Sequence, residues 1–500
     1  MRTDMPVEPS EAGPGGPAPA PAPKRTRPAL VEGPIARTLF MFSLPILGSS
    51  ILQSINGSIN AIWIGRLIGS DGLAATLNAN GILFFLLSIG FGLGMAGMIL
   101  IGQGLGAGDV SQVKRTVGTT LVFFTALSFV MALGGFLAAP QMLSAMRTPS
   151  EVMSLASAYL RVIFLALPAI YLYTFVMMAL RGSGDSRTPF IFLAISAALD
   201  VGLNPIMILG LGPIPALGIS GSALATLLSQ WIGLAALLIW LYRKHHFLRL
   251  TRDELRYLKL DGEILRALVA KGMPMALQMI VMSSSMLAMS SLVNRHGATT
   301  AAAYSACFQL WSYIQMPAMA VGNAASSMAA QNVGAGRWDR VSRIAQTGVL
   351  YNIVLTGMLV LVVTLIDRGA FAIFLGGDRP AIDIARHIHF IGSWSFVVFG
   401  VAFVLSSVVR ATGAVVPPLI FLFIAMWLVR LPFAWALGRS LGADAIWWSF
   451  PLGSLTSMLL LLTYYQIGGW KKARMLEPHM DSAAGAQPCR SAGQWVRLPK

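Results

Sequence analysis

The chain has 500 residues, of which 56% are hydrophobic and 11% charged. Soluble domains carry about 25% charged residues, and a mean hydropathy of +0.70 leaves too little polar surface for a soluble fold. Composition therefore predicts an integral membrane protein. Long unbroken apolar runs indicate spanning helices, since spanning strands give only a weak alternating pattern. Two cysteines and six histidines exclude a disulfide scaffold and show no metal-ligand spacing.

Twelve apolar stretches are long enough to span, since about 20 residues cross a bilayer core. They are approximately 39–64, 73–102, 112–138, 153–180, 188–210, 217–242, 265–293, 298–330, 341–366, 384–409, 414–438 and 442–467. The predicted fold class is an all-α integral membrane protein with twelve transmembrane helices in two parallel six-helix repeats, an N-lobe and a C-lobe.

The predicted organisation has five parts. They are a disordered Pro/Ala/Gly-rich tail over 1–34, an N-lobe over 35–242, a basic linker over 243–264, a C-lobe over 265–467 and a mobile C-terminal tail over 468–500. The first segment holds nine of the 27 prolines and lacks apolar side chains to bury. It has no apolar region before its basic cluster, so it is not read as a signal peptide.

Lys and Arg are distributed unevenly between alternate loops. The side that holds the N-terminus carries 27 of the 36, the opposite side carries seven, and two lie within spans. Basic residues favour the cytoplasmic side, so both termini are expected to be cytoplasmic, in the plasma (inner) membrane. Topology and anionic lipid account for the net charge of +16 without a nucleic-acid partner.

The two halves of the chain align at an offset of about 229 residues. Three pairs of expected motif and hinge residues show the register: Pro45 with Pro274, Gln103 with Gln331, and Arg181 with Arg410. Each repeat has an even number of spans, so the halves are related by an axis along the membrane normal. Parallel repeats of this kind are typical of alternating-access transporters, with a site near the midplane.

Three motifs carry a family resemblance. They are Gln-x-x-Gly-Ala-Gly-Asp (103–109), Arg-Gly-x-Gly-Asp-x-Arg-Thr-Pro (181–189) and Leu-Gly-x-x-Gly-Ser-Ala-x-Ala-Thr (217–226). With the Ile-Gly-Arg that ends the first span, they resemble the multidrug and toxic compound extrusion (MATE) family over about 36–470. The resemblance implies a two-lobed exporter that exchanges H⁺ or Na⁺ for organic, often cationic, compounds.

One acid, Asp200, falls in the middle of a span. An acid in hydrocarbon is a functional candidate by default. Ser196, Asp200 and Asn204 share one face of their helix, and a matching stripe runs along the first span through Ser49, Gln53, Asn56 and Asn60. If the stripes face each other, the N-lobe holds a polar pocket around one acid. Asn60 and Asn204 are therefore assigned to the coupling-ion site with Asp200, and Gln53, Asn56, Ser196 and Thr226 to the substrate cavity.

Two roles for Asp200 stay open. A carboxyl group in a low-dielectric cavity takes up protons more readily than one in water, and it can release the proton when a cation arrives. Alternatively Arg161, at a similar depth, forms a permanent ion pair that keeps Asp200 ionised. The other spanning cation, Arg430, is expected to extend outward to the interface.

The chain departs from the family at several acidic positions. Many members have Asp where Asn60 stands, and the usual Asn-then-Asp order of the fifth span is reversed here as Asp200 and Asn204. Branches of the family carry a C-lobe Glu at the position of Met282 and an Asp in the tenth span, where this chain has no acid between 388 and 409. A carboxylate Na⁺ cage in the C-lobe is therefore not expected. Proton coupling is favoured, and Na⁺ coupling stays open.

Five methionines line one stripe of the seventh span. They are Met275, Met279, Met282, Met286 and Met289. Methionine repacks around varied shapes, so Met279 and Met282 are assigned to the cavity, with ordinary packing or lipid contact as the alternative. The aromatic residues Trp311, Tyr313 and Trp394 can hold a cation or form a packed or interfacial belt.

The predicted function is export of hydrophobic, often cationic compounds in exchange for protons, with no bound cofactor. Alternatives are Na⁺-coupled export, and export or flipping of an endogenous metabolite or lipid-linked precursor. A membrane-embedded enzyme is disfavoured, because the midplane acid has no nearby His, Cys or metal ligand. Expected partners are small organic cations, H⁺ or Na⁺ and the lipid bilayer, and the chain is expected to be a monomer.

Overall fold

The computed structural model describes residues 30–210, 215–376 and 378–476. Within these ranges all regular structure is helical. The first half contains α1 (Ile35–Leu67), α2 (Ser70–Ala107), α3 (Val110–Ala145), α4 (Ser150–Ser183), α5 (Arg187–Leu209) and α6 (Ile219–Arg243). A 3₁₀ turn, η1 (Arg252–Tyr257), lies in the connection to the second half.

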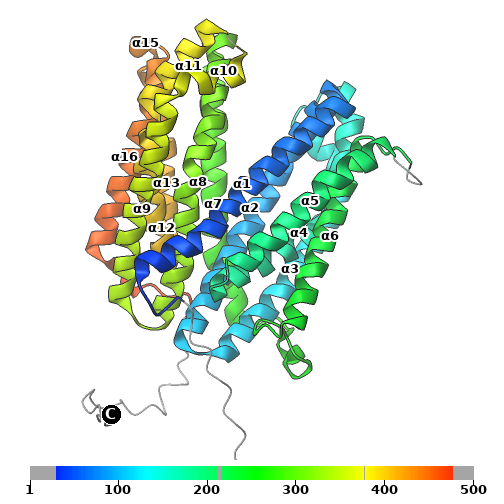
Figure 1. Ribbon diagram of the computed structural model, residues 1–500, viewed down its shortest axis with the longest axis vertical. Coiled ribbons are helices and arrows are strands. Elements are labelled where there is room, and N and C mark those ends of the chain that lie inside the picture. The colour runs from blue at the N-terminus through cyan, green and yellow to red at the C-terminus, as the bar shows by residue number, and fades with distance from the viewer. Residues whose placement is uncertain (1–29, 211–214, 377, 477–500) are drawn as a thin grey trace, which may run out of the picture.

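The second half has more interruptions. It contains α7 (Gly262–Asn294), α8 (Ala298–Gly334), α9 (Trp338–Leu365), α10 (Asp367–Leu375), α11 (Arg379–Gly392), α12 (Ser395–Arg410), α13 (Val416–Phe423), the π-helical η2 (Ile424–Arg430), α14 (Leu431–Ala436), α15 (Gly438–Leu441), α16 (Asp444–Ile467) and η3 (Gly469–Lys472). Ten described helices are long and apolar enough to span, and the pair α11–α12, bent by 44°, makes an eleventh. The small and polar residues of α8 lower its hydropathy, but its 37 residues run the length of the molecule (Figure 1).

The predicted all-α, two-lobed membrane fold is confirmed. In the first lobe, α2 and α4 pack against each other and against α3, and α4 also packs against α6. In the second, α8, α9, α12 and α16 pack together. Each of the twelve predicted spans corresponds to one long helix or to a broken one.

The sequence motifs provide the helix ends. Gly108 (φ 74°) ends α2, and Asp109 then caps α3 by accepting a hydrogen bond from the Gln112 N–H at 2.9 Å. Gly184 (φ 95°) ends α4 in the same way. Glycine takes a left-handed conformation without steric cost, and aspartate satisfies the free N–H groups of a first turn. The glycine-rich loops are therefore explained by chain reversal.

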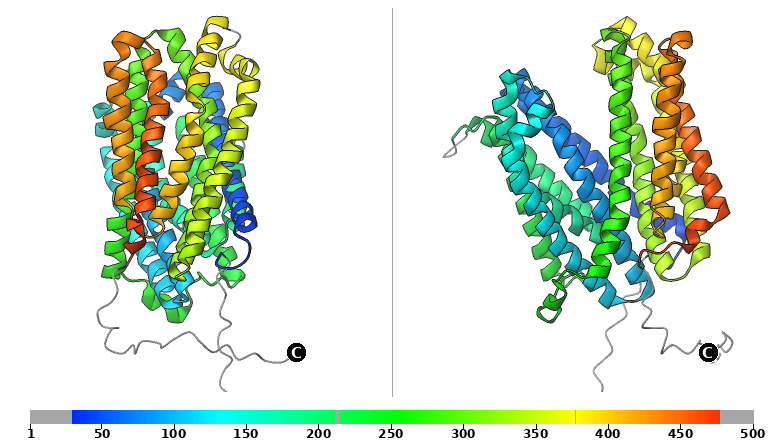
Figure 2. Two further views of the ribbon diagram at one scale, coloured as in Figure 1. Left: turned by 90° about the vertical axis from the view of Figure 1, so that its left-hand side faces the viewer. Right: turned by 180° about the vertical axis from the view of Figure 1, so that it is seen from behind.

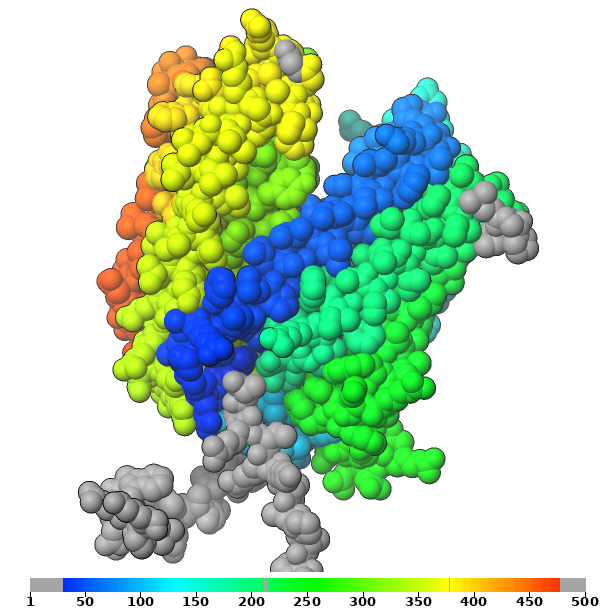
Figure 3. Space-filling view, in the orientation of Figure 1, coloured from blue at the N-terminus to red at the C-terminus, as the bar shows by residue number. Residues whose placement is uncertain are grey.

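The lobes meet at one end and separate toward the other (Figures 1 and 2). At the closed end α2 packs against both α7 and α8. The space-filling view shows a gap that opens between the lobes at the opposite end (Figure 3).

Both ends of the described chain are bound at the closed end. The Leu30 N–H donates to Gln331, and the Asn332 side chain donates to the Leu30 carbonyl. The tail predicted to be disordered over 1–34 therefore does not extend to residue 34, because residues 30–33 bind α8 and the start of α9; its first 29 residues lie outside the described ranges. Trp470 and Met475 are buried, so the C-terminal segment is also packed as far as residue 476.

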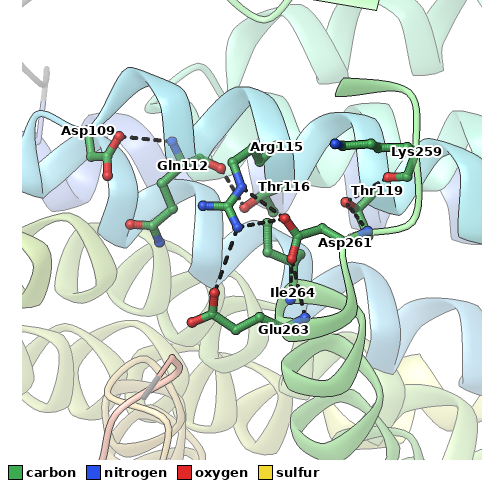
Figure 4. A network of polar contacts seen from close by, with 9 residues as sticks. All are labelled: Asp109, Gln112, Arg115, Thr116, Thr119, Lys259, Asp261, Glu263 and Ile264. Carbon is green, nitrogen blue, oxygen red and sulfur yellow. Dashed lines mark hydrogen bonds and ion pairs between the residues drawn. The ribbon is translucent and has the colours of Figure 1, made fainter. Parts of the chain in front are cut away.

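The basic linker is bound to α3 (Figure 4). Arg115 of α3 donates from Nη2 to Asp261 at 2.6 Å, and Asp261 also caps α7. Lys114 forms a second ion pair with Glu254 of η1 at 2.8 Å. These contacts fix the start of α7 against the first lobe.

Candidate functional site

A cavity of about 690 Å³ lies between the lobes. Its walls come mainly from α1, α2, α4, α5 and α6, and Met279 of α7 with Met319 and Asn323 of α8 close it from the other side. Many of its lining residues are amides or hydroxyls, while methionines and phenylalanines supply apolar patches. A mixed lining of this kind suits an amphiphilic small molecule.

Asp200 forms part of the cavity wall and is only 4% exposed. Its Oδ2 accepts hydrogen bonds from Asn56 Nδ2 at 2.9 Å and Asn60 Nδ2 at 2.6 Å. Its Oδ1 accepts from Thr226 Oγ1 at 3.1 Å, with Asn204 Nδ2 at 3.5 Å. The two polar stripes of α1 and α5 therefore do face each other, and α6 adds a third side.

Two amide oxygens in the group of neutral side chains around Asp200 have no hydrogen-bond donor. Asn56 Oδ1 and Asn204 Oδ1 are buried and form no hydrogen bond within the described part of the chain. Proton uptake by the carboxyl group would require one partner to present an acceptor to the new O–H, because Asp200 accepts at both oxygens. Either the Thr226 hydroxyl group reverses its role or an amide turns its oxygen toward the carboxyl group. These surplus oxygens make that exchange of donor and acceptor feasible.

The proposed ion pair with Arg161 is absent from this arrangement. Arg161 is exposed and its guanidinium lies over the Phe136 ring, 5.6 Å from the centroid. Similar depth along two helices did not bring the two side chains together, because Arg161 projects from α4 away from the cavity. Asp200 is held by neutral donors instead.

The other cavity assignments divide into two groups. Gln53, Ser196 and Met279 line the main cavity, and the Ser196 hydroxyl donates to the Ser229 carbonyl. Met282 does not line it; it borders a separate space of about 40 Å³ inside the second lobe. The methionine stripe thus faces several environments, and Met275 and Met289 are packed in the core.

Arg181 is a cavity residue that the sequence reasoning missed. It was assigned to a motif after the fourth span, but its side chain lines the cavity at the end of α4. Tyr159, Tyr173, Gln230 and Asn323 also line the cavity without having been predicted. The position of Arg181 in the repeated motif was the signal available for it, whereas the others look like ordinary residues of apolar helices.

Two glutamines join the lobes at the closed end. Gln103 of α2 donates from Nε2 to the Ala411 carbonyl at 2.7 Å, and Gln331 of α8 donates from Nε2 to the Gly182 carbonyl at 2.9 Å. The two bonds are related by the internal repeat, since the donors match at an offset of 228 residues and the acceptors at 229. We call these four residues the glutamine latch.

Glycines permit the close approach at this latch. A Cβ on Gly106 would overlap the carbonyl oxygen of Gln331, and a Cβ on Gly334 would overlap that of Gln103. The two lobes therefore contact through bare backbone, again with the symmetry of the repeat. Pro45 and Pro274 lie inside α1 and α7 as expected, and their role as hinges stays a prediction.

The second lobe has its own buried cations. Arg410 donates from Nη1 to Gln278 Oε1 at 2.6 Å and from Nη2 to Ser407 Oγ at 2.9 Å. Arg430 was expected to extend outward, and this is wrong: it is 4% exposed and lies 3.6 Å from the centroid of the Phe450 ring. The π-helical segment turns it into the lobe, where the aromatic cluster accommodates its charge.

The aromatic candidates lie away from the cavity. Trp311 is fully buried between Phe396 and Phe450. Tyr313 and Trp394 are partly exposed on the surface of the second lobe. Packing accounts for Trp311, and none of the three side chains lines the cavity.

Two lobes that enclose a polar cavity and close it at one end define a membrane transporter. The family model described as MatE matches residues 45–206 and 274–436, one match in each lobe. The chain belongs to the MatE family. Its members are transporters, which confirms the predicted class and sets this chain apart from enzymes.

Relatives and solved structures agree with this assignment. The chain is 35% identical to "Probable multidrug resistance protein YoeA" of Bacillus subtilis, over 91% of this chain and 98% of that protein. It is 23% identical to "Multidrug export protein MepA" of Staphylococcus saprophyticus, over 89% and 97%. A solved structure titled as the outward-facing conformation of a multidrug resistance MATE family transporter superposes with a TM-score of 0.81, at 20% identity, over 90% of this chain and 99% of that one.

Proposed function

We propose that this transporter exports amphiphilic organic compounds, often cationic, in exchange for protons, with Asp200 as the proton carrier. The observation that supports the proposal is the carboxylate cage at the cavity wall, since Asp200 is reachable from the cavity and its partners are neutral. A carboxyl group without a permanent cation beside it can alternate between a bound proton and a bound cation. Protonation and cargo binding then exclude each other, which is the requirement for antiport.

In this proposal the lobes rock about the central cavity. The closed end is cytoplasmic, with both termini inside the cell and the chain in the plasma membrane as a monomer. The proposal treats the structure as an outward-open state, in which the glutamine latch holds the cytoplasmic side shut. Proton binding at Asp200 from outside releases the cargo, and opening of the latch returns the proton to the cytoplasm.

The test uses purified protein in proteoliposomes loaded with rhodamine 123 under an imposed pH gradient without sodium. Gradient-dependent transport is expected for the native chain, and Asp200→Asn is expected to abolish it at equal protein level. Asp71→Asn, which removes an exposed acid from α2, serves as the matched control. Unchanged transport by Asp200→Asn contradicts the carrier role.

Sodium is the second candidate for the coupling ion. The buried, unpaired Oδ1 atoms of Asn56 and Asn204 favour it, because Na⁺ binds carbonyl and carboxylate oxygens. A sodium gradient at equal pH on both sides separates the two ions. Transport under the sodium gradient alone would replace H⁺ by Na⁺ in the proposal and leave the drug-export function in place.

A further inference from the structure

Arg181 is a buried cation without a partner. It is 9% exposed and lines the main cavity. Its Nε is enclosed and forms no hydrogen bond. Across the described residues its side chain has no hydrogen bond, ion pair or ring contact, whereas most buried charges in proteins are paired.

The repeat makes this isolation specific to the first lobe. Arg410 holds the equivalent place in the second lobe, and Gln278 and Ser407 accept from its guanidinium. Arg181 has no such acceptors and borders the open cavity instead. The second lobe therefore supplies acceptors to both Nη atoms of its arginine, although the Nε of Arg410 also lacks a partner. Among the described residues, the first lobe supplies no acceptor to the guanidinium of Arg181.

The charge of the cavity leads to the same conclusion. Among its lining residues in the described ranges, Asp200 and Arg181 are the charged ones. Asp200 accepts hydrogen bonds from Asn56, Asn60 and Thr226, whereas Arg181 has no hydrogen-bond partner among the described residues. A cargo that is only cationic would leave Arg181 unpaired.

We propose that Arg181 binds an anionic group of the transported compound, a carboxylate or a phosphate. The inference rests on the proposed export function and narrows its cargo to amphiphiles that carry a negative group beside an apolar body. Arginine presents a planar fork of N–H donors that matches these groups. Met177 and Met178, which precede Arg181 on α4 and also line the cavity, supply adaptable contacts for the apolar part.

The anionic group also lies next to the contact between the lobes. Gly182, the next residue, accepts the latch hydrogen bond from Gln331 through its carbonyl. Cargo held by Arg181 thus occupies the closed end of the cavity, where the lobes must part to admit it from the other side.

A matched pair of dyes tests this directly. Rhodamine 110 carries a free carboxylate, and rhodamine 123 is its methyl ester. Binding of each to purified protein in dodecyl maltoside is measured by fluorescence polarisation, which needs no ion gradient. The native chain is expected to bind rhodamine 110 at least about tenfold more tightly than the ester.

Variants locate the effect. Arg181→Gln is expected to weaken rhodamine 110 binding about tenfold and to leave rhodamine 123 within about twofold, while Arg181→Lys restores part of the difference. Arg187→Gln, which removes an exposed arginine near the same end of the molecule, is the charge-matched control and should change neither. Equal weakening of both dyes, or no weakening of rhodamine 110, overturns the proposal.

If Arg181→Gln does not fold, binding of the two dyes to the native chain still tests the proposal. Tighter binding of the ester than of the acid overturns the proposal without any variant. Gradient-driven transport of rhodamine 123 that does not depend on Arg181, together with no preference for rhodamine 110, would end this inference and leave the export function intact. Absence of transport for both dyes under either gradient would contradict the export function itself.

Discussion

In the proposed mechanism the transporter alternates between an outward-open and an inward-open state, and loss of the glutamine latch should shift the balance between them. Gln103→Ala leaves the Ala411 carbonyl without its partner, and Gln331→Ala does the same to Gly182. An unpaired buried carbonyl costs about 1–3 kcal/mol. Each 1.4 kcal/mol is about a factor of ten in an equilibrium constant, so each variant should lower the outward-open population about tenfold relative to the inward-open one. Gln331→Ala should have a larger effect on this ratio than Gln103→Ala, because Gln331 also accepts a hydrogen bond from the Leu30 N–H at 3.2 Å.

The two bonds are separate contacts, so the double variant should lose about a hundredfold if their effects add. Spin labels on cysteines at positions 66 and 295, both exposed at the outer ends of α1 and α7, report the separation of the lobes by double electron–electron resonance. The native Cys307 is buried, and Cys489 is replaced by serine. Gln141→Ala, an exposed glutamine of α3, is the control. An unchanged distance distribution in the double variant would refute the latch.

Two more predictions follow from the closed end. Gly106→Leu places a side chain against the Gln331 carbonyl, so it should keep the lobes apart and abolish transport at normal expression. The control is Gly134→Leu, which should leave transport intact because a Cβ there meets no atom within 4 Å. Transport by Gly106→Leu would contradict the close contact. Burial would raise the pKa of Asp261, but hydrogen bonds from Arg115 and from backbone N–H groups outweigh it and hold that pKa below its usual range. The stabilisation is therefore present above the unfolded-state pKa near 4 and is lost as the pH falls through the lowered folded-state pKa. Asp261→Asn should lower the melting temperature at pH 7. The melting temperature of the variant should also decrease less than that of the native chain between about pH 5 and 2, because the variant has no carboxylate to protonate at this position. Melting curves identical to those of the native chain would contradict the prediction.

The sequence supplied the helices and the repeat because both depend on local patterns. Apolar runs of spanning length, and the glycine and aspartate residues that end and begin helices, are recognised from neighbouring residues alone. The stripe through Asn56 and Asn60 depends only on helical spacing. These features located Asp200 and its partners on two facing helices. The equivalence of Gln103 and Gln331 was also visible, although their bond partners were not.

Side-chain direction at a given depth is where prediction from the sequence failed. Arg161 and Asp200 were expected at similar depth, but the face of its helix from which each side chain projects decides whether it enters the cavity, and Arg161 is exposed beside Phe136. Arg430 turned inward because η2 is π-helical, and the extra residue per turn shifts every later side chain around the axis. The predicted fourth span ended just before Arg181, which placed this residue in a loop, but α4 continues through Arg181 to Ser183.

The two repeats share the contacts that close the cavity, but they differ in their buried charged groups. Both lobes contribute one glutamine, one acceptor carbonyl and one close-contact glycine to the latch, so closure draws equally on the two halves. The carboxylate cage belongs to the first lobe, and the second lobe has Arg410 and Arg430 buried among amide, hydroxyl and aromatic groups. Met282 and the acid-free α12 leave no described carboxylate in that part of the second lobe, whereas Asp200 lines the main cavity, which is why the proposal places the coupling ion there. In the proposed antiport mechanism, protonation therefore changes in the first lobe, and the closure that both lobes share would couple that change to opening at the other side of the membrane.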